Sequence, residues 1–186
     1  MVLAVPHPRV PLEGDAAYWY RSALGWAVAD GSPAQLLTGR DFDVLELPAD
    51  AGAAVLRRTE RTGPVAVQGR RMRLLVAAGS AEELPGLLDW LEWGGVALDL
   101  TAVGEGGRMT APPPPGRDHV RGAARWLRPP GRGSRLPALA GFGDIGHAPD
   151  LVRLVDTAAT ECHRVRLLRV GRARVQRTET QPLAFS

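Results

Sequence analysis

The sequence is short of three residue types, and each shortage removes a class of function. The 186-residue chain has one cysteine, Cys162, so it forms neither an internal disulfide nor a zinc site of several thiolates. It has no lysine, which excludes Schiff-base chemistry on a lysine and a phosphate-binding loop of the Walker A type. It also has no asparagine and therefore no N-glycosylation site. All 23 basic side chains are arginines.

Long apolar segments are also missing. No run approaches the roughly 18 residues that a membrane-spanning helix needs. Residues 1–12 contain three prolines and lack the apolar core of a signal peptide. We therefore expect a cytoplasmic protein that makes no contact with membranes. A length of 186 residues and a hydrophobic share of 45% predict one domain with a packed core.

Charge is divided unevenly along the chain. Residues 1–120 hold 11 arginines and 15 acidic residues, a net charge of −4, whereas residues 121–186 hold 12 arginines and 5 acidic residues, a net charge of +7. A basic C-terminal third is typical of proteins that contact a polyanion. The residues that we assign to nucleic-acid binding are Arg164, Arg166, Arg169, Arg172 and Arg174. The alternative is that these charges only solvate an exposed helix face.

Hydrophobic periodicity and turn residues predict an α+β domain with one mixed or antiparallel sheet and flanking helices. The expected helices cover 13–24, 50–61, 80–93 and, as the longest, 149–170. The expected strands cover 26–28, 41–47, 65–67, 71–77, 96–100 and 119–127, of which the third and fourth form a hairpin. Residues 30–40 are rich in turn formers. The resulting division is an N-terminal extension at 1–12, a domain at 13–170 and a polar tail at 171–186 whose composition is typical of disorder.

The third predicted helix opens with Ser80 and Glu83 at the spacing of a capping box, in which each side chain binds a free backbone N–H of the other residue. Near its end, Trp90 and Trp93 extend the apolar stripe of leucines, which favours packing in the core. The alternative is that both tryptophans lie on the surface. They would then mark a protein-interaction module together with the rigid segment Pro112–Pro115.

Several motifs lack the neighbouring elements or the spacing that their usual function requires. The stretch GFGDIG at 141–146 matches the dinucleotide-binding pattern, but it neither follows a predicted strand nor opens a helix. Cys162 and His163 are adjacent in the last helix and point about 100° apart, so they do not form a catalytic pair. Cys162 lies on the apolar stripe and is interpreted as a packing residue. The histidines His7, His119, His147 and His163 lack the spacing of a metal site.

The strand predicted at 41–47 alternates acidic and apolar residues. Carboxylates two residues apart on a strand point to one face, which is how two acids hold a divalent cation. Asp41 and Asp43 have this spacing, and Asp99 on the strand predicted at 96–100 would complete such a site, which makes these acids candidate metal ligands. The alternative is an edge strand whose acidic face is exposed to water.

Four stretches, in the same order, resemble the N-terminal domain of bifunctional DNA primase/polymerases, within the archaeo-eukaryotic primase superfamily. They are YWYRSALGWAV at 18–28, DVLELPADAG at 43–52, GRRMRLLVAAG at 69–79 and GVALDLTAVGEGGRMTAPPP at 95–114. The last stretch is the most similar. As a whole, the chain most resembles short stand-alone versions of this domain that end in a helix.

In active members of that family, carboxylates on two strands bind two divalent ions, Mg²⁺ or Mn²⁺, for nucleotidyl transfer. The resemblance places these roles on Asp43 or Glu46 and on Asp99. It places Pro48, which cannot bind a metal, at the position of the partner acid.

A histidine of the family contacts the nucleotide phosphate, and its position falls on Arg71 or Met72. The neighbouring arginines Arg70, Arg71 and Arg73 are therefore assigned to phosphate binding. The resemblance implies the family's fold, with catalysis lost, no metal cofactor, and DNA or a nucleotide as partner. Two alternatives stay open: an active metal-dependent primase/polymerase and a non-enzymatic protein-interaction module. No particular protein partner is predicted.

Overall fold

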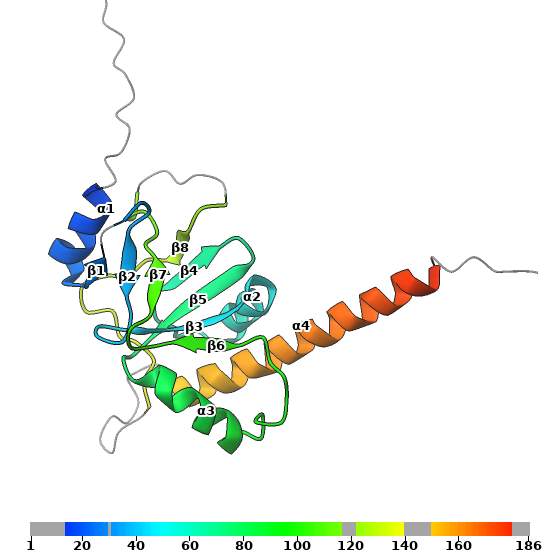
Figure 1. The fold of residues 1–186 in the computed structure, drawn as a ribbon. Helices are drawn as coiled ribbons and strands as arrows, with labels where there is room; N and C mark the ends of the chain where they lie inside the picture. Colours follow the sequence, from blue (N-terminus) through cyan, green and yellow to red (C-terminus); the bar gives the residue numbers. More distant parts are fainter. Residues whose placement is uncertain (1–13, 30, 117–121, 140–149, 180–186) are drawn as a thin grey trace, which may run out of the picture.

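The computed structural model describes residues 14–29, 31–116, 122–139 and 150–179. Its helices are α1 (Gly14–Trp19), continued by the π-helical turn η1 (Tyr20–Leu24), α2 (Ala49–Arg58), α3 (Ser80–Trp90) and α4 (Leu151–Glu179). Its strands are β1 (Val28–Ala29), β2 (Gln35–Leu37), β3 (Asp43–Pro48), β4 (Val65–Gln68), β5 (Arg71–Val76), β6 (Thr101–Val103), β7 (Arg108–Thr110) and β8 (Arg125–Arg128). Figure 1 shows their arrangement.

The strands form two sheets. The larger has the order β6-β3-β5-β4-β8 and the smaller the order β1-β2-β7, and every pairing between these strands is antiparallel. The predicted α+β class and the hairpin of β4 and β5 are confirmed, whereas the expectation of a single sheet is wrong. The chain changes sheets at the tight turn after β6, where the N–H of Gly107 donates to the carbonyl of Gly104 at 3.0 Å. The next strand, β7, then pairs with β2, in a stretch predicted as turns.

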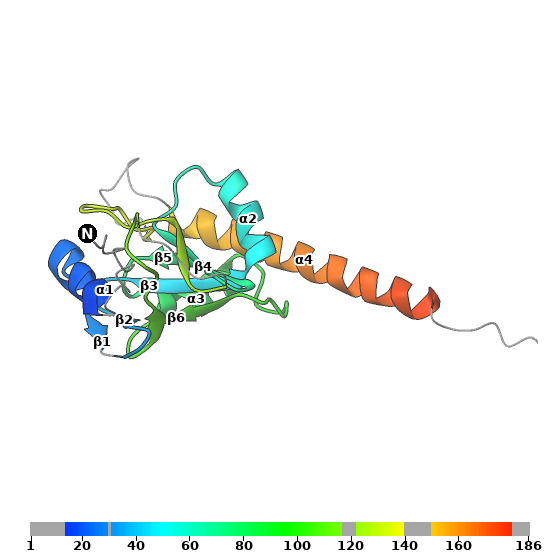
Figure 2. The ribbon, with the colours of Figure 1, turned by 90° about the horizontal axis from the view of Figure 1, so that it is seen from above.

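Helices α2, α3 and α4 cover one face of the larger sheet (Figures 1 and 2). Because side chains alternate along a strand, Leu45 and Leu47 of β3 lie on this face together with Met72 and Leu74 of β5. Gly52 of α2 allows the helix to approach closely, since a Cβ there would lie 2.3 Å from the sulfur of Met72. This layer is the main hydrophobic core.

The smaller sheet and α1 cover part of the opposite face. Val44 of β3 packs there with Phe42 and with the buried ring of Tyr20. The Tyr20 hydroxyl donates to the carbonyl of Pro112 at 2.7 Å and accepts from the indole of Trp126 at 2.8 Å. Strand β3 is therefore central and buried on both faces, so the interpretation of it as an exposed edge strand is wrong.

The start of α3 differs from the prediction. Its N-cap is Gly79, which has a φ of 89°, and Ser80 is already the first helical residue. Glycine has no side chain that could cap the helix, but it readily adopts the left-handed backbone conformation that leads into it. The predicted capping box of Ser80 and Glu83 is therefore wrong, because Ser80 lies inside the helix and not at the N-cap.

The strand predicted at 96–100 is also wrong. Here the chain forms turns, with the N–H of Val96 donating to the carbonyl of Trp93 at 2.9 Å. The strand begins only at Thr101, which lies opposite Glu46 of β3. Asp99 consequently lies in a loop before β6 and not on a strand.

The last helix is longer than predicted. It runs to Glu179, through most of the segment predicted as a polar tail, because arginine and alanine are good helix formers and the single Gly171 does not stop it.

The two tryptophans at the end of the predicted third helix have different environments. Trp93 packs partly against the core, whereas Trp90 is 71% exposed. The prediction that Trp90 faces the core is wrong.

In the described part of the chain, no helix is both long and apolar enough to cross a lipid bilayer. The predictions for residues 1–12 and for the glycine motif at 141–146 lie outside the described residues, as do those for the last seven residues and for His7, His119 and His147.

Candidate functional site

Several of the predicted site residues meet on one face of the larger sheet, at the end that the smaller sheet does not cover. Glu46 on β3 lies opposite Arg73 on β5, and Arg71 on β5 lies opposite Gln68 on β4. The two-residue period of a strand places all four side chains on the same side. Glu46 and Arg73 are about one-fifth exposed, and Arg71 is 29% exposed.

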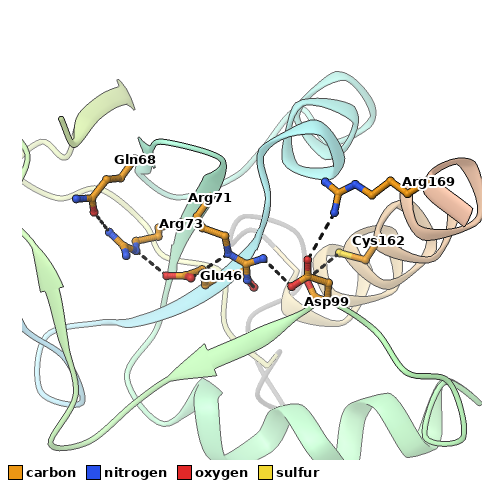
Figure 3. A network of polar contacts seen from close by, with 7 residues as sticks. All are labelled: Glu46, Gln68, Arg71, Arg73, Asp99, Cys162 and Arg169. Carbon is orange, nitrogen blue, oxygen red and sulfur yellow. Dashed lines mark hydrogen bonds and ion pairs between the residues drawn. The ribbon is translucent and has the colours of Figure 1, made fainter. Parts of the chain in front are cut away.

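These side chains form a continuous network (Figure 3). The Nε atom of Arg71 donates to Glu46 Oε1 at 3.0 Å, and Nε of Arg73 donates to Glu46 Oε2 at 2.8 Å. Both carboxylate oxygens of Glu46 are thus engaged by guanidinium groups. Arg73 also donates from Nη1 to Gln68 Oε1 at 2.7 Å, and Arg71 donates from Nη2 to the carbonyl of Glu46 at 3.3 Å.

Asp99 joins this network to the last helix. Arg71 Nη1 donates to Asp99 Oδ1 at 2.6 Å, and Arg169 of α4 lies 3.9 Å from Asp99 Oδ2. The same guanidinium lies 3.8 Å from Asp50 Oδ2 on α2. The Cys162 thiol donates to the backbone carbonyl of Asp99 at 3.6 Å. The two carboxylates that the sequence singled out on this face are therefore bound by arginines of the same chain.

Charge pairing shifts the pKa values in this network. Partial burial by itself raises the pKa of Glu46, but hydrogen bonds and charge from Arg73 and Arg71 outweigh it and lower that pKa below its usual range. Burial likewise acts to lower the pKa of Arg71, and Asp99 and Glu46 overcome it and raise that pKa. Both groups are held in their charged forms.

Asp43, the third candidate ligand, points the other way. It lies three residues before Glu46 on β3, so its side chain is on the helix-covered face, where it is fully buried. Its Oδ2 accepts a hydrogen bond from the backbone N–H of Ala81 at 2.9 Å, in the first turn of α3. The carboxylate therefore caps the helix, and its expected convergence with Glu46 and Asp99 is not found.

The described residues do not fit the pair of divalent ions that the resemblance implies. Mg²⁺ binds through one or more free carboxylates, and here Glu46 and Asp99 are neutralised by arginines while Asp43 is on the opposite face. Pro48, on the same face as Glu46, has no ligating side chain. Within the described residues, no group of three histidine, cysteine or acidic residues is placed to hold a metal ion.

Cys162 is confirmed as a packing residue. It is 1% exposed within the core between α4 and the sheet. Burial, followed by the negative charge of Asp99, raises the pKa of its thiol to about 12. A thiol in this environment stays protonated at neutral pH and is a poor nucleophile.

The predicted phosphate-binding and nucleic-acid-binding arginines lie in two different settings. Arg70 is exposed in the β4–β5 turn, whereas Arg71 and Arg73 are engaged in the network. The others lie on α4, whose C-terminal end extends beyond the body of the domain (Figures 1 and 2). The exposed arginines of α4 after Cys162 are Arg164, Arg166, Arg169 and Arg172. Of these, Arg166 donates to the carbonyl of Ala97, and Arg169 contacts Asp50 and Asp99. The side chain of Arg174 is outside the described set.

Sequence reasoning missed two members of the site. Gln68 joins the network because the β4–β5 hairpin places it opposite Arg71; the hairpin was predicted, but its register was not. Asp50 meets Arg169 across the α2–α4 packing, and no local sequence pattern announces a contact between residues 119 positions apart.

No family model matches the chain, and neither a curated protein nor a solved structure matches it.

Proposed function

We propose that the chain is a nucleic-acid-binding domain of primase/polymerase-like origin that no longer transfers nucleotides. The observation that carries the proposal is the outer half of α4, which projects from the domain with exposed arginines (Figure 2). The family origin is taken from the four sequence stretches that resemble primase/polymerases.

The arginines of the outer helix are accessible to phosphates. Arg172 is exposed and has no ion pair with another described residue. Arg169 lies 3.8–3.9 Å from Asp50 and Asp99, and exposed pairs of this kind contribute little in water. Arg164 is exposed and lies 4.0 Å from the buried Glu161. Arg166 is exposed and donates one hydrogen bond to the carbonyl of Ala97. From Arg164 to Arg172 the helix rises roughly 12 Å. Duplex DNA carries one charge for about every 1.7 Å of its axis, so this length meets several phosphates.

The proposed loss of nucleotidyl transfer rests on the carboxylates of Glu46 and Asp99, which arginines of the same chain already bind. Each oxygen of Glu46 accepts a hydrogen bond from an arginine, and Asp99 is shared by Arg71 and Arg169. A cation entering this site would have to displace guanidinium groups that already balance the negative charge. The network therefore supports a structural role for this face of the sheet.

Binding is tested with fluorescein-labelled single-stranded and duplex DNA, by fluorescence anisotropy over a salt series from about 50 to about 200 mM. We expect the affinity to fall steeply with salt, and the variant Arg164→Gln/Arg172→Gln/Arg174→Gln to bind at least about tenfold more weakly with a shallower salt slope. The matched control is Arg40→Gln/Arg108→Gln/Arg125→Gln, which removes the same charge from exposed positions elsewhere. Equal loss in both triple variants, or binding independent of salt, would overturn the role of α4.

Catalysis is tested separately by primer extension with Mg²⁺ or Mn²⁺ and deoxynucleotides. We expect no extension above the level of a Glu46→Gln/Asp99→Asn variant. Extension by the wild type that this variant abolishes would show that the carboxylates still hold catalytic metal, and the proposal of lost transfer would be wrong. Because the two assays measure different properties, DNA binding and the loss of catalysis can each be refuted without the other.

A further inference from the structure

The outward face of α3 is acidic and carries an exposed aromatic side chain. Between Ser80 and Trp93 the sequence holds four acidic residues and no arginine. All four, Glu82, Glu83, Asp89 and Glu92, are exposed. Trp90 is 71% exposed among them. Gly86 lies one turn before Trp90, and a Cβ there would meet no atom within 4 Å, so the surface is open beside the indole.

The outer half of α4 has the complementary properties. Between Cys162 and Glu179 the sequence holds six arginines and one glutamate. Leu167 and Leu168 are each 57% exposed and Val170 is 60% exposed. At 100° per residue, Leu167, Val170 and Gly171 lie roughly opposite Val165, which packs on the core. A Cβ at Gly171 would also meet open space.

These two surfaces do not meet within one chain. The inner side of α3 packs on the first part of α4, where Trp93 Nε1 donates to Asp156 Oδ1 at 3.2 Å and the Trp93 ring lies 5.8 Å from that of His163. Beyond this contact α4 is straight and leads away from α3 (Figures 1 and 2). Arg166 and Arg169 still contact the domain, at the carbonyl of Ala97 and at Asp50 and Asp99. The acidic outward face of α3 and the side of α4 that carries Leu167 and Val170 are left exposed.

We propose that the occupant is a second copy of this chain, with the outer half of α4 of one copy on the α3 face of the other. Trp90 of α3 is exposed among acidic residues, and Leu167 and Val170 of α4 are exposed among arginines, so the two surfaces have opposite charge. Apolar centres with polar rims are the usual anatomy of protein interfaces. A two-fold arrangement makes this contact twice and therefore doubles the area that is buried.

The choice of a second copy over other partners follows from charge complementarity. A membrane surface would attract the arginines of α4 but would leave the acidic face of α3 without a partner. Two α4 helices would repel each other because both are basic. The acidic α3 face is complementary to α4 in charge, carries the exposed Trp90 and is present in equal amount. This inference does not depend on the proposed DNA binding.

The test uses the full chain, freed of nucleic acid by nuclease and a high-salt wash, in sedimentation-velocity ultracentrifugation. We expect dimers at about 50 mM salt and monomers at about 500 mM, because screening weakens contacts between opposite charges. Glu83→Arg alone and Arg164→Glu alone should both be monomeric at low salt, because Arg164 lies about 60° from Leu167 on the same side of α4. A wild type that is monomeric at every salt and protein concentration would overturn the proposal.

Mixing the two single variants provides the sharper result. In a mixed dimer, one contact pairs the unchanged α3 of the Arg164→Glu copy with the unchanged α4 of the Glu83→Arg copy, and the other pairs two reversed charges. Dimers should therefore reappear in the mixture and in the double variant Glu83→Arg/Arg164→Glu. Circular dichroism and melting temperatures equal to the wild type ensure that the single variants are folded. Dimers that persist in both single variants, or a mixture of folded variants that stays monomeric, would contradict this interface.

Discussion

The buried carboxylate of Asp43 accepts the backbone N–H of Ala81 at 2.9 Å, which connects the start of β3 to the first turn of α3. Four N–H groups at a helix start lack partners within the helix, and a nearby acid both satisfies one of them and stabilises the helix dipole. In this chain the acid comes from 38 residues earlier in the sequence rather than from the helix itself.

We predict that Asp43→Ala lowers the free energy of unfolding by about 1–3 kcal/mol, since it removes a cap and leaves the partly buried N–H of Ala81 unpaired. Ser80→Ala should cost less than about 0.5 kcal/mol, because Ser80 is not the N-cap. Urea denaturation of both variants measures the difference. If Ser80→Ala were the more damaging change, the cap would have been assigned to the wrong residue.

The helix start shows where sequence reasoning reached its limit. Serine followed three residues later by glutamate is a good sign that a helix begins nearby, and α3 does begin there. The sequence could not show which group caps it, because Asp43 reaches the helix only through the packing of α3 on the sheet. Asp43 therefore looked like a metal ligand when its partner was unknown.

Glu46 should stabilise the fold through its two arginines. Glu46→Gln keeps the size of the side chain but removes the charge and one acceptor, so Arg71 and Arg73 lose charge-assisted hydrogen bonds. We expect a loss of about 1–3 kcal/mol at neutral pH, measured by urea denaturation. A change below about 0.3 kcal/mol would mean that solvent screening cancels the network.

The pairing of Glu46 with Arg71 and Arg73 also predicts how the free energy of unfolding depends on pH. The pKa of Glu46 is lowered in the folded state, so its contribution is fully present above the unfolded pKa of about 4.3 and is lost as the pH falls through the folded pKa. The difference in unfolding free energy between wild type and Glu46→Gln should be constant above about pH 6 and shrink below about pH 4. Denaturation curves collected from pH 7 to the acid range test this, and a difference that grew on acidification would contradict the assigned pairing.

The predictable part of the fold is the local part. The β4–β5 hairpin joins residues a few positions apart across Gly69, and α2 and α4 have continuous apolar stripes, so pattern alone located them. The smaller sheet joins Gln35 to Thr110, and no turn signal or period connects segments so far apart. The charged network has the same origin, since Asp99 meets Arg169 only after α4 packs on the domain.

Cys162 should be unreactive in the native protein. It is 1% exposed and burial raises its pKa to about 12, so the thiolate is scarce and inaccessible at pH 8. We predict that Ellman's reagent reacts at least roughly a hundredfold more slowly with native protein than with protein in guanidinium chloride. One thiol per chain should be titrated after unfolding. Rapid modification of the folded protein would show that the α4 contact opens readily.

Two helical glycines give a final prediction in which the same substitution has opposite effects. Alanine is favoured over glycine by up to about 1 kcal/mol inside a helix, and this gain applies to both Gly52 of α2 and Gly86 of α3. At Gly86 the added Cβ meets no atom within 4 Å, so Gly86→Ala should stabilise the protein by about 0.5–1 kcal/mol. At Gly52 the Cβ would lie 2.3 Å from the sulfur and 2.9 Å from the Cβ of Met72, so overpacking should outweigh the gain and destabilise by about 1–3 kcal/mol.

The two variants are compared by thermal unfolding at high salt, where self-association is screened. The double variant Gly52→Ala/Met72→Ala tests whether Met72 causes the destabilisation. If Gly52→Ala raised the melting temperature, α2 would not pack on β5 as closely as described.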